Sequence, residues 1–232
     1  MRLMLARQRR RMIDEHGRPV AAGRDYDRGE ITADAIVHGV GLTLGVVGAA
    51  ILIALAVRSP ANGSLPGATI YAAGLLAMLT FSAAYNLWPV SRTKWLLRRL
   101  DHSAIYLLIA ATYTPFMAQL KQGPVASTML VIVWAIAAVG IVIKLALPGR
   151  FDRLSILLYL LLSWSGVMMY DVIAALPSSS LRLLGVGGLV YTFGVIFHFW
   201  SRLRFQNAIW HTFVVVAAAC HYAAVLDLLA RA

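Results

Sequence analysis

Two pairs of polar residues with helical spacing stand out in an otherwise apolar sequence. Asn207 and His211 are four residues apart in NAIWHTFVVVAAACHY, and Ser82 and Asn86 have the same spacing in SAAYN. On a helix, residues four apart lie on one face about one turn from each other. Asp101 adds a carboxylate at the start of another apolar stretch. Polar groups are costly at membrane depth, so these five are functional candidates by default.

Two kinds of chemistry fit these side chains. A metal site needs three or more nitrogen or oxygen donors at fixed distances, and one helix face can supply two of them. A hydrolytic site adds an open position for water and a group that orients it, a role that Asp101 and Ser82 could take beside His211. The third interpretation is a hydrogen-bond network that only holds helices together, since Asn, His and Ser often pair between membrane helices. The residues alone leave these interpretations open.

The composition indicates an integral membrane protein. Of the 232 residues, 60% are hydrophobic and 13% are charged, and the mean hydropathy is +0.73. Soluble domains are typically about half apolar and a quarter charged. The net charge of +11 does not indicate nucleic-acid binding, because the basic residues lie between apolar stretches. A single cysteine, Cys220, excludes an intramolecular disulfide framework and a cysteine-based zinc cluster.

Seven apolar stretches predict an all-α, polytopic membrane protein with a seven-transmembrane-helix bundle. Each is close to the roughly 20 residues that cross about 30 Å of hydrocarbon. The expected spans are 33–57, 66–88, 101–119, 125–147, 154–173, 181–200 and 207–230. They form a transmembrane domain at 30–232, preceded by a basic segment at 1–29 that we expect to be retained in the cytoplasm. Gly41, Gly45 and Ala49 form a small-residue face that predicts close helix contact.

The distribution of basic residues predicts the orientation. Seventeen of the 21 lysines and arginines lie in the N-terminal segment or in alternate linkers, and four lie on the other side. This split puts the N-terminus in the cytoplasm and the C-terminus outside, in the cell (inner) membrane. The polar candidates, together with His38, His102 and His198, then fall in the cytoplasmic third of the bundle. His221 lies deeper, about 15 Å along the helix from His211.

Four sequence blocks resemble the haemolysin III family, which belongs with the progestin and adiponectin receptor (PAQR) group. They are EITADAIVHGVG at 30–41, SAAYN at 82–86, RRLDHSAIYLLIAATYTPF at 98–116 and NAIWHTFVVVAAACHY at 207–222. The resemblance covers all seven spans and implies a zinc site on the cytoplasmic side. Its usual donors are a histidine ending an S-x-x-x-H motif in the second span and an H-x-x-x-H pair in the seventh. An aspartate opening the third span holds or activates the zinc-bound water, and related membrane ceramidases use a similar set to hydrolyse a lipid amide.

Carried onto this chain, the resemblance matches Ser82, Asp101 and His211, but Asn86 and Asn207 stand where histidines are expected. Because a neutral Asn oxygen is a weak zinc ligand, zinc is doubtful on this donor set. One of the other histidines, His38, His102 or His198, could complete the site. Alternatively, a harder cation could bind through Asn, Asp and water oxygens. A third possibility is a hydrogen-bond network without a metal, formed by Asn86, Asp101, Asn207 and His211.

The sequence therefore predicts a haemolysin III-like membrane protein with a polar site at its cytoplasmic side. As a metal-dependent hydrolase of a lipid amide or ester, it would use Asp101 and Ser82 as catalytic residues. Its metal ligands would be His211, Asp101, Asn86 and Asn207. The alternative is a non-enzymatic membrane-homeostasis or sensor protein with a degenerate site. The interpretation as a cytolytic pore is supported by the family name only, and the interpretation as a transporter is supported mainly by Asp171 and Asp227. The expected partner is membrane lipid, and no nucleic acid is expected.

Overall fold

The computed structural model describes residues 26–59, 64–89, 91–120, 123–147, 151–169 and 173–231. Within these ranges the chain forms seven α-helices and one short 3-10 helix, and no strand. Their bounds are α2 Arg28–Arg58, α3 Ser64–Leu87, α4 Arg92–Gln119, α5 Gly123–Ala146, α6 Asp152–Trp164, η1 Ser165–Met169, α8 Ser178–Phe199 and α9 Gln206–Ala230. The predicted seven-helix, all-α fold is confirmed. Most of the N-terminal basic segment, and Asp171, lie outside the described residues.

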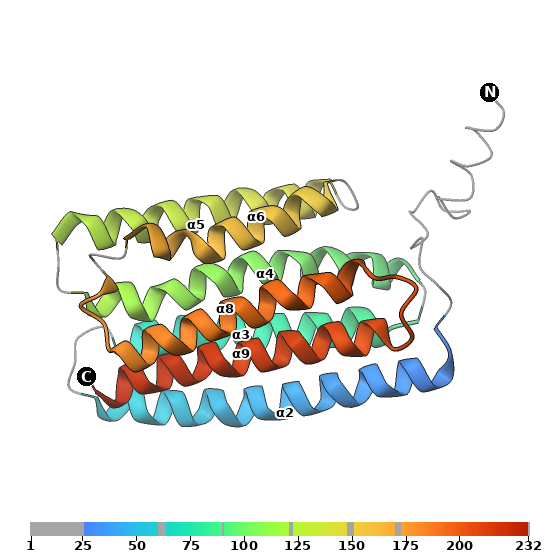
Figure 1. Cartoon of the computed structure of the whole chain (residues 1–232), viewed down its shortest axis with the longest axis horizontal. Coiled ribbons are helices and arrows are strands. Elements are labelled where there is room, and N and C mark those ends of the chain that lie inside the picture. Colours follow the sequence, from blue (N-terminus) through green and yellow to red (C-terminus); the bar gives the residue numbers. More distant parts are fainter. Residues whose placement is uncertain are drawn as a thin grey trace.

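The helices run side by side along the long axis of the molecule (Figure 1). α2 packs against α3 and α9, α3 against α4, α4 against α5, and α8 against α9. α6 packs more loosely than the other helices, mainly against α4 and α8. One end of the bundle holds the starts of α2, α4, α6 and α9, and we call it the basic end. Of the arginines and lysines in described residues, it carries Arg28, Arg92, Lys94, Arg98, Arg99, Lys144, Arg202 and Arg204.

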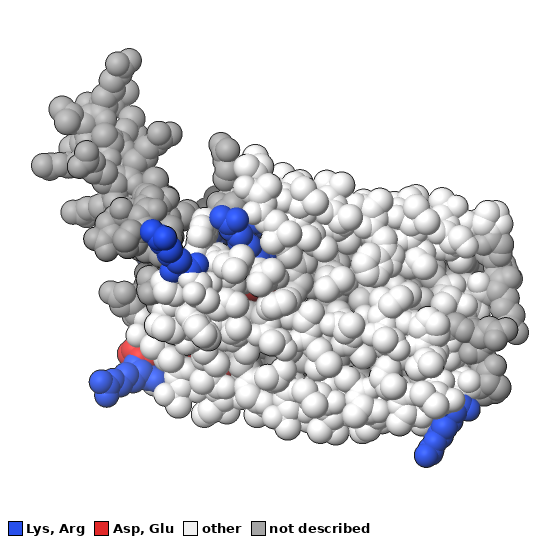
Figure 2. Space-filling view, turned by 180° about the vertical axis from the view of Figure 1, so that it is seen from behind, with Lys and Arg blue, Asp and Glu red and all other residues white. Residues whose placement is uncertain are grey.

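The outer surface is that of a multi-pass integral membrane protein. Five helices, α2, α3, α5, α8 and α9, are long and apolar enough to cross a membrane. On α2 the exposed side chains include Ile36, Val40, Leu44 and Ile51, which follow one helix face. Figure 2 shows Lys and Arg gathered toward the two ends of one face, with other residues forming the surface between them. This banding matches a hydrocarbon layer between two polar boundaries.

The small-residue face of α2 is buried, as predicted. A Cβ added at Gly41 would lie 2.8 Å from Val215 Cγ2 of α9, and one added at Gly45 would lie 2.4 Å from Leu79 Cδ1 of α3. Both distances are too short for real Cβ atoms. The glycines therefore allow α2 to approach α3 and α9 closely, and this approach brings the polar side chains of the three helices together.

The fifth apolar stretch is not one continuous α-helix over 154–173. α6 ends at Trp164 and continues as the 3-10 turn η1 to Met169. The cause is Tyr113 of α4, whose hydroxyl accepts a hydrogen bond from the Gly166 N–H (2.8 Å) and donates to the Leu162 carbonyl (3.0 Å). In an α-helix these two backbone groups would bond to each other. A side chain inserted between them interrupts the helical ladder.

Candidate functional site

Three buried side chains from α2 and α9 form a cluster at the basic end. His211 Nδ1 lies 2.6 Å from Asp34 Oδ1, and His38 Nε2 lies 3.7 Å from Asp34 Oδ2. The rings of His38 and His211 are 4.3 Å apart between centroids. One ligand atom from each residue can be chosen so that all three lie within 4.8 Å of one another. We call Asp34, His38 and His211 the donor cluster.

Two asparagines connect the donor cluster to α3. Asn207 Nδ2 donates to Asp34 Oδ2 (3.2 Å) and to Asn86 Oδ1 (3.1 Å). Asn86 Nδ2 donates to the Ser82 carbonyl (2.9 Å) and lies 3.4 Å from His211 Nε2. If His211 carries its proton on Nδ1, it donates to Asp34 and accepts from Asn86, so one tautomer satisfies both contacts. The predicted pairs at 82/86 and 207/211 therefore meet through Asn86, and Asp34 contacts both members of the second pair.

The donor cluster has the chemistry of a metal site. It offers one carboxylate and two imidazoles, which are ligands that zinc and similar transition metals favour. His38 Nε2 is buried and has no hydrogen-bond partner in the described part of the chain. A buried nitrogen without a partner is costly unless something occupies its lone pair or takes its proton. Two ligand atoms of one zinc ion are at most about 4 Å apart, whereas the three ligand atoms here lie within 4.8 Å of one another. A small inward movement of these side chains would therefore bring them to metal-binding distance.

The structure brings together some of the predicted site residues and separates others. Asp101 and Ser82 are buried and line the same cavity as Asp34 and His211, and the Ser82 hydroxyl is a hydrogen-bonding neighbour of the Asp101 carboxylate. Asp101 is not one of the three donors that lie within 4.8 Å of one another. Its position is therefore beside the donor cluster, on the α4 wall.

Of the three histidines considered as additional donors, His38 alone joins the donor cluster. His102 points to α6, where its Nδ1 lies 3.9 Å from Asp152 Oδ1. The His198 ring packs against Trp210, with centroids 4.9 Å apart. Asp34 was not singled out from the sequence. The available signal was its spacing of four residues from His38, which is the same spacing that marked Asn207 and His211.

Capping interactions fix the starts of α2 and α9 relative to each other. Asp27 and Glu30 form a capping box, in which the Asp27 side chain accepts from Glu30 N (2.8 Å) and Glu30 Oε2 accepts from Asp27 N (3.0 Å). Glu30 Oε1 also accepts from the N–H of Phe205 (3.0 Å), the residue that precedes α9. The Glu30 N–H and the nearby Arg204 hold the pKa of Asp27 below its ordinary value. The same box that starts α2 thus anchors α9, and so places His211 beside Asp34.

A cavity of about 1160 Å³ extends from the donor cluster through the bundle. Trp88 and Lys94 line it at the basic end, and Leu176 and Leu181 line it near the opposite end. Most of its wall between these ends is apolar, with lining residues such as Ile109 and Phe116. A long cavity with one polar end and apolar walls suits an amphipathic ligand.

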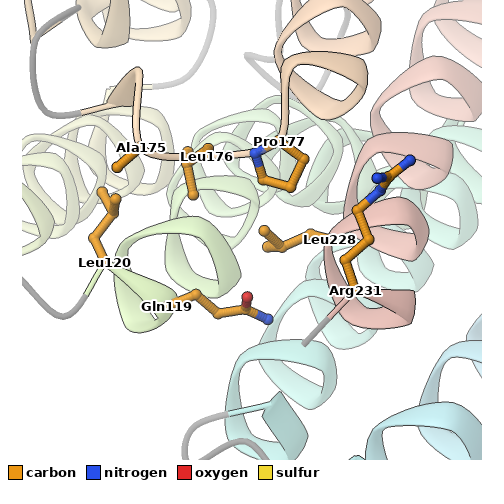
Figure 3. Close-up of a pocket in the computed structure, with 7 residues that line it drawn as sticks. All are labelled: Gln119, Leu120, Ala175, Leu176, Pro177, Leu228 and Arg231. Atoms are coloured by element: carbon orange, nitrogen blue, oxygen red, sulfur yellow. The ribbon is translucent and has the colours of Figure 1, made fainter.

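A smaller hollow of about 340 Å³ lies at the end of the bundle opposite the donor cluster (Figure 3). Its lining residues are Gln119, Leu120, Ala175, Leu176, Pro177, Leu228 and Arg231. Arg231 is paired with Asp227 (2.8 Å), which also accepts hydrogen bonds from Ser179 and Ser180. Asp227 is therefore part of a local surface network rather than of the donor cluster.

Comparison with known proteins identifies the family. The family model described as "Haemolysin-III related" matches residues 30–222. The chain belongs to the haemolysin III family. It is 36% identical over 198 residues to "Hemolysin-3 homolog" of Bacillus subtilis (strain 168), covering 85% of this chain and 93% of that protein. It is 35% identical to "Hemolysin-3" of Bacillus cereus, covering 85% of this chain and 90% of that protein.

A human relative extends the match beyond the bacterial haemolysins. "Monocyte to macrophage differentiation factor" of Homo sapiens is 34% identical over 173 residues, or 71% of each chain. The predicted membership of this haemolysin III family protein in the PAQR group is therefore confirmed. No solved structure matches the chain.

Proposed function

We propose that this haemolysin III family protein is a metal-dependent hydrolase of a lipid amide or ester within the membrane. The observation that carries the proposal is the position of the donor cluster. Asp34 and His211 line the polar end of a cavity whose remaining wall is largely apolar, and His38 contacts both of them from behind this wall. A lipid chain could occupy the apolar part while its amide or ester group lies beside the donor cluster.

The donor cluster would hold the metal through His38, His211 and the Asp34 carboxylate. In this chain His38 and Asp34 of α2 would replace the donors that the family resemblance places at Asn86 and Asn207. Asn207 keeps a supporting role, because its amide donates to Asp34 Oδ2 and orients that carboxylate. A bound zinc ion would supply Lewis-acid polarisation of the scissile carbonyl and a water that ionises near neutral pH.

The α4 wall would supply the proton transfer. Asp101 is buried, lines the cavity and has the Ser82 hydroxyl as a neighbour. Its carboxylate would take a proton from the attacking water and deliver it to the leaving amine or alcohol. Ser82 would orient that carboxylate or donate a hydrogen bond to the substrate oxygen. These roles require Asp101 to remain beside the donor cluster rather than within it.

The test combines metal analysis with turnover. Protein is purified in mild detergent without an affinity-tag metal column, its metal content is measured by elemental mass spectrometry, and lipid products are followed by liquid chromatography and mass spectrometry. We expect near-stoichiometric metal that is lost in His211→Ala. Asp101→Asn should keep the metal and lose turnover by about 100-fold or more. Asp227→Asn, at the opposite end of the bundle, is the matched control and should keep both.

One observation favours a second function without catalysis. The contacts from Asn86 through Asn207 and Asp34 to His211 form a closed hydrogen-bond network across α2, α3 and α9. Such a network could hold the helices of a membrane-homeostasis or sensor protein. In that case, neither wild type nor His211→Ala would contain metal, and His211→Ala would lower stability without changing any lipid product. That result would end the hydrolase proposal for this chain.

A further inference from the structure

A second polar cluster lies on the α4–α5–α6 side of the cavity. Asp152, the first residue of α6, accepts from Arg98 Nη2 of α4 (2.7 Å) and from Lys144 Nζ of α5 (2.8 Å). Only 2% of the Lys144 surface is exposed, so this ammonium is buried in the interior. Lys94 lies one helical turn before Arg98 on α4. Lys94, Arg98 and Lys144 all line the cavity, and we call them the cationic wall.

The cationic wall has more positive charge than its own carboxylate neutralises. Asp152 is shared between Arg98 and Lys144. Lys94 donates to two backbone carbonyls, those of Trp88 (2.8 Å) and Asn86 (3.3 Å), and no carboxylate of the described residues pairs with it. Asp101, which also lies on α4, is within electrostatic reach of Arg98, so three cations face two carboxylates on this side of the cavity.

The other acids of the cavity have hydrogen-bond partners of their own, although Asp34 and Asp101 remain within electrostatic reach of Lys94 and Arg98. Glu30 accepts from the N–H groups of Asp27 and Phe205, and Asp34 is bound by His211 and Asn207. Asp101 has the Ser82 hydroxyl as its neighbour. The two sides of the polar end thus differ: the α2–α9 side carries carboxylate and imidazole donors, and the α4–α5 side carries the surplus cations.

We propose that the cavity binds a lipid with an anionic phosphate headgroup, held by the cationic wall, with its acyl chain in the apolar part. Basic pockets between transmembrane helices are typical sites for such headgroups. Arg supplies a planar set of donors and Lys a compact charge, and both pair well with phosphate oxygens. As a statement about the substrate class of the hydrolytic site, this inference rests on the proposed function. The binding of the lipid itself does not require hydrolysis.

Binding can be measured directly by native mass spectrometry on the full chain in detergent. The probes are dioleoyl-phosphatidylglycerol, dioleoyl-phosphatidylcholine and soluble glycerol phosphate. We expect the anionic lipid to bind about tenfold more tightly than the zwitterionic one. Glycerol phosphate should bind far more weakly, because it lacks the chains that fill the apolar cavity. Equal binding of the two lipids, or of glycerol phosphate and the anionic lipid, would overturn the proposal.

A matched pair of variants separates the cationic wall from general surface charge. Among the described residues Lys94 is paired with backbone carbonyls and with no carboxylate, so Lys94→Gln should leave the fold intact while weakening the binding of the anionic lipid about tenfold. Arg92 is exposed, belongs to the same helix turn and does not line the cavity. Arg92→Gln should have no effect. Equal losses in the two variants would show that only the charged membrane surface attracts the lipid, which would overturn the assignment to the cavity.

Asp152→Asn tests the alternative that the ion pairs only hold α6 in place. Removing this carboxylate frees Arg98 and Lys144, so the anionic lipid should bind at least as tightly as it does to wild type. Lys144→Gln should instead weaken the binding of the anionic lipid about tenfold. A loss of binding in both variants would identify a purely structural clamp and overturn the proposal. Thermal unfolding in detergent checks that each variant is folded. If Asp152→Asn does not fold, the comparison of Lys94→Gln with Arg92→Gln decides whether the cationic wall binds the lipid.

Turnover distinguishes a failure of this inference from a failure of the proposed function. Selective binding of the anionic lipid, with no metal and no product, would support the binding site and reject the hydrolase. Turnover of a neutral lipid, with no preference for the anionic one, would support the hydrolase and overturn the anionic headgroup. The two results involve different readouts, so neither can be mistaken for the other.

Discussion

The donor cluster and the cationic wall face the same cavity but are built in different ways. In the donor cluster, the short side chain of Asp34 reaches His211 across two helices that pack closely at Gly41. In the cationic wall, long side chains of Arg98 and Lys144 reach Asp152 across helices that lie farther apart. Short polar groups in a membrane protein therefore depend on close backbone approach, whereas long cations can bridge a gap and remain movable.

This difference also separates two kinds of function. A metal site needs donors held within a few tenths of an ångström, and closely packed helices provide that precision. A headgroup site must admit and release a large ligand, which suits α6, the helix with the loosest packing. Because the two sites are built in different ways, a variant that disrupts one of them should leave the other functional.

The largest expected effect comes from removing the acid of the donor cluster. Asp34→Ala leaves His38 and His211 buried without their shared carboxylate, which should cost about 3 kcal/mol of unfolding free energy and abolish metal binding. The matched variant Asp152→Ala should also cost about 3 kcal/mol, because it leaves the buried Lys144 ammonium without its carboxylate, but it should keep the metal. Chemical unfolding in detergent and elemental mass spectrometry measure both. Full metal content in Asp34→Ala would contradict the donor assignment.

A smaller effect should follow from widening the contact between α2 and α9. Gly41→Val would place side-chain atoms against Val215 and Leu79, at a cost of about 2 kcal/mol and with weaker metal binding. Gly39, two residues earlier, has no neighbouring atoms within 4 Å of an added Cβ, so Gly39→Val is the control and should change neither property. Lipid binding at the cationic wall should survive in both. If Gly41→Val weakened lipid and metal binding equally, the two sites would not be independent.

The smallest expected effect concerns the cap of α2. Asp27→Ala removes the side-chain acceptor of the capping box and should lower the melting temperature by about a degree or two at pH 7. Asp27→Asn keeps a side-chain acceptor, so its melting temperature should fall by less than that of Asp27→Ala. Because the pKa of Asp27 is lowered in the folded protein, the contribution of its carboxylate is present above its unfolded pKa and is lost as the pH falls through the folded value. The difference between wild type and Asp27→Asn should therefore begin to shrink below about pH 4 and vanish only below the lowered folded pKa. A difference that stays constant in scanning fluorimetry would contradict this account.

Much of the fold, and part of the site, could be predicted from the sequence. Hydrophobic length predicts the helices, and the four-residue spacing predicts that Asn207 and His211 share a face, because both are local properties of one helix. The contact of Asp34 with His211 joins residues 177 positions apart, and no local spacing reports it. Lys144 is one of the 17 basic residues whose distribution predicts the orientation, but its side chain points inward to Asp152, since only tertiary packing decides which way a boundary lysine turns.

The break at the end of α6 changes the length of that segment. An α-helix rises 1.5 Å per residue and a 3-10 helix about 2.0 Å. The 13 residues of α6 and the five of η1 therefore extend over about 30 Å, compared with about 27 Å for the same residues in a continuous α-helix. By interposing its hydroxyl between Leu162 and Gly166, Tyr113 lengthens this short segment by about 2.5 Å, which brings it closer to the roughly 30 Å of a hydrocarbon layer.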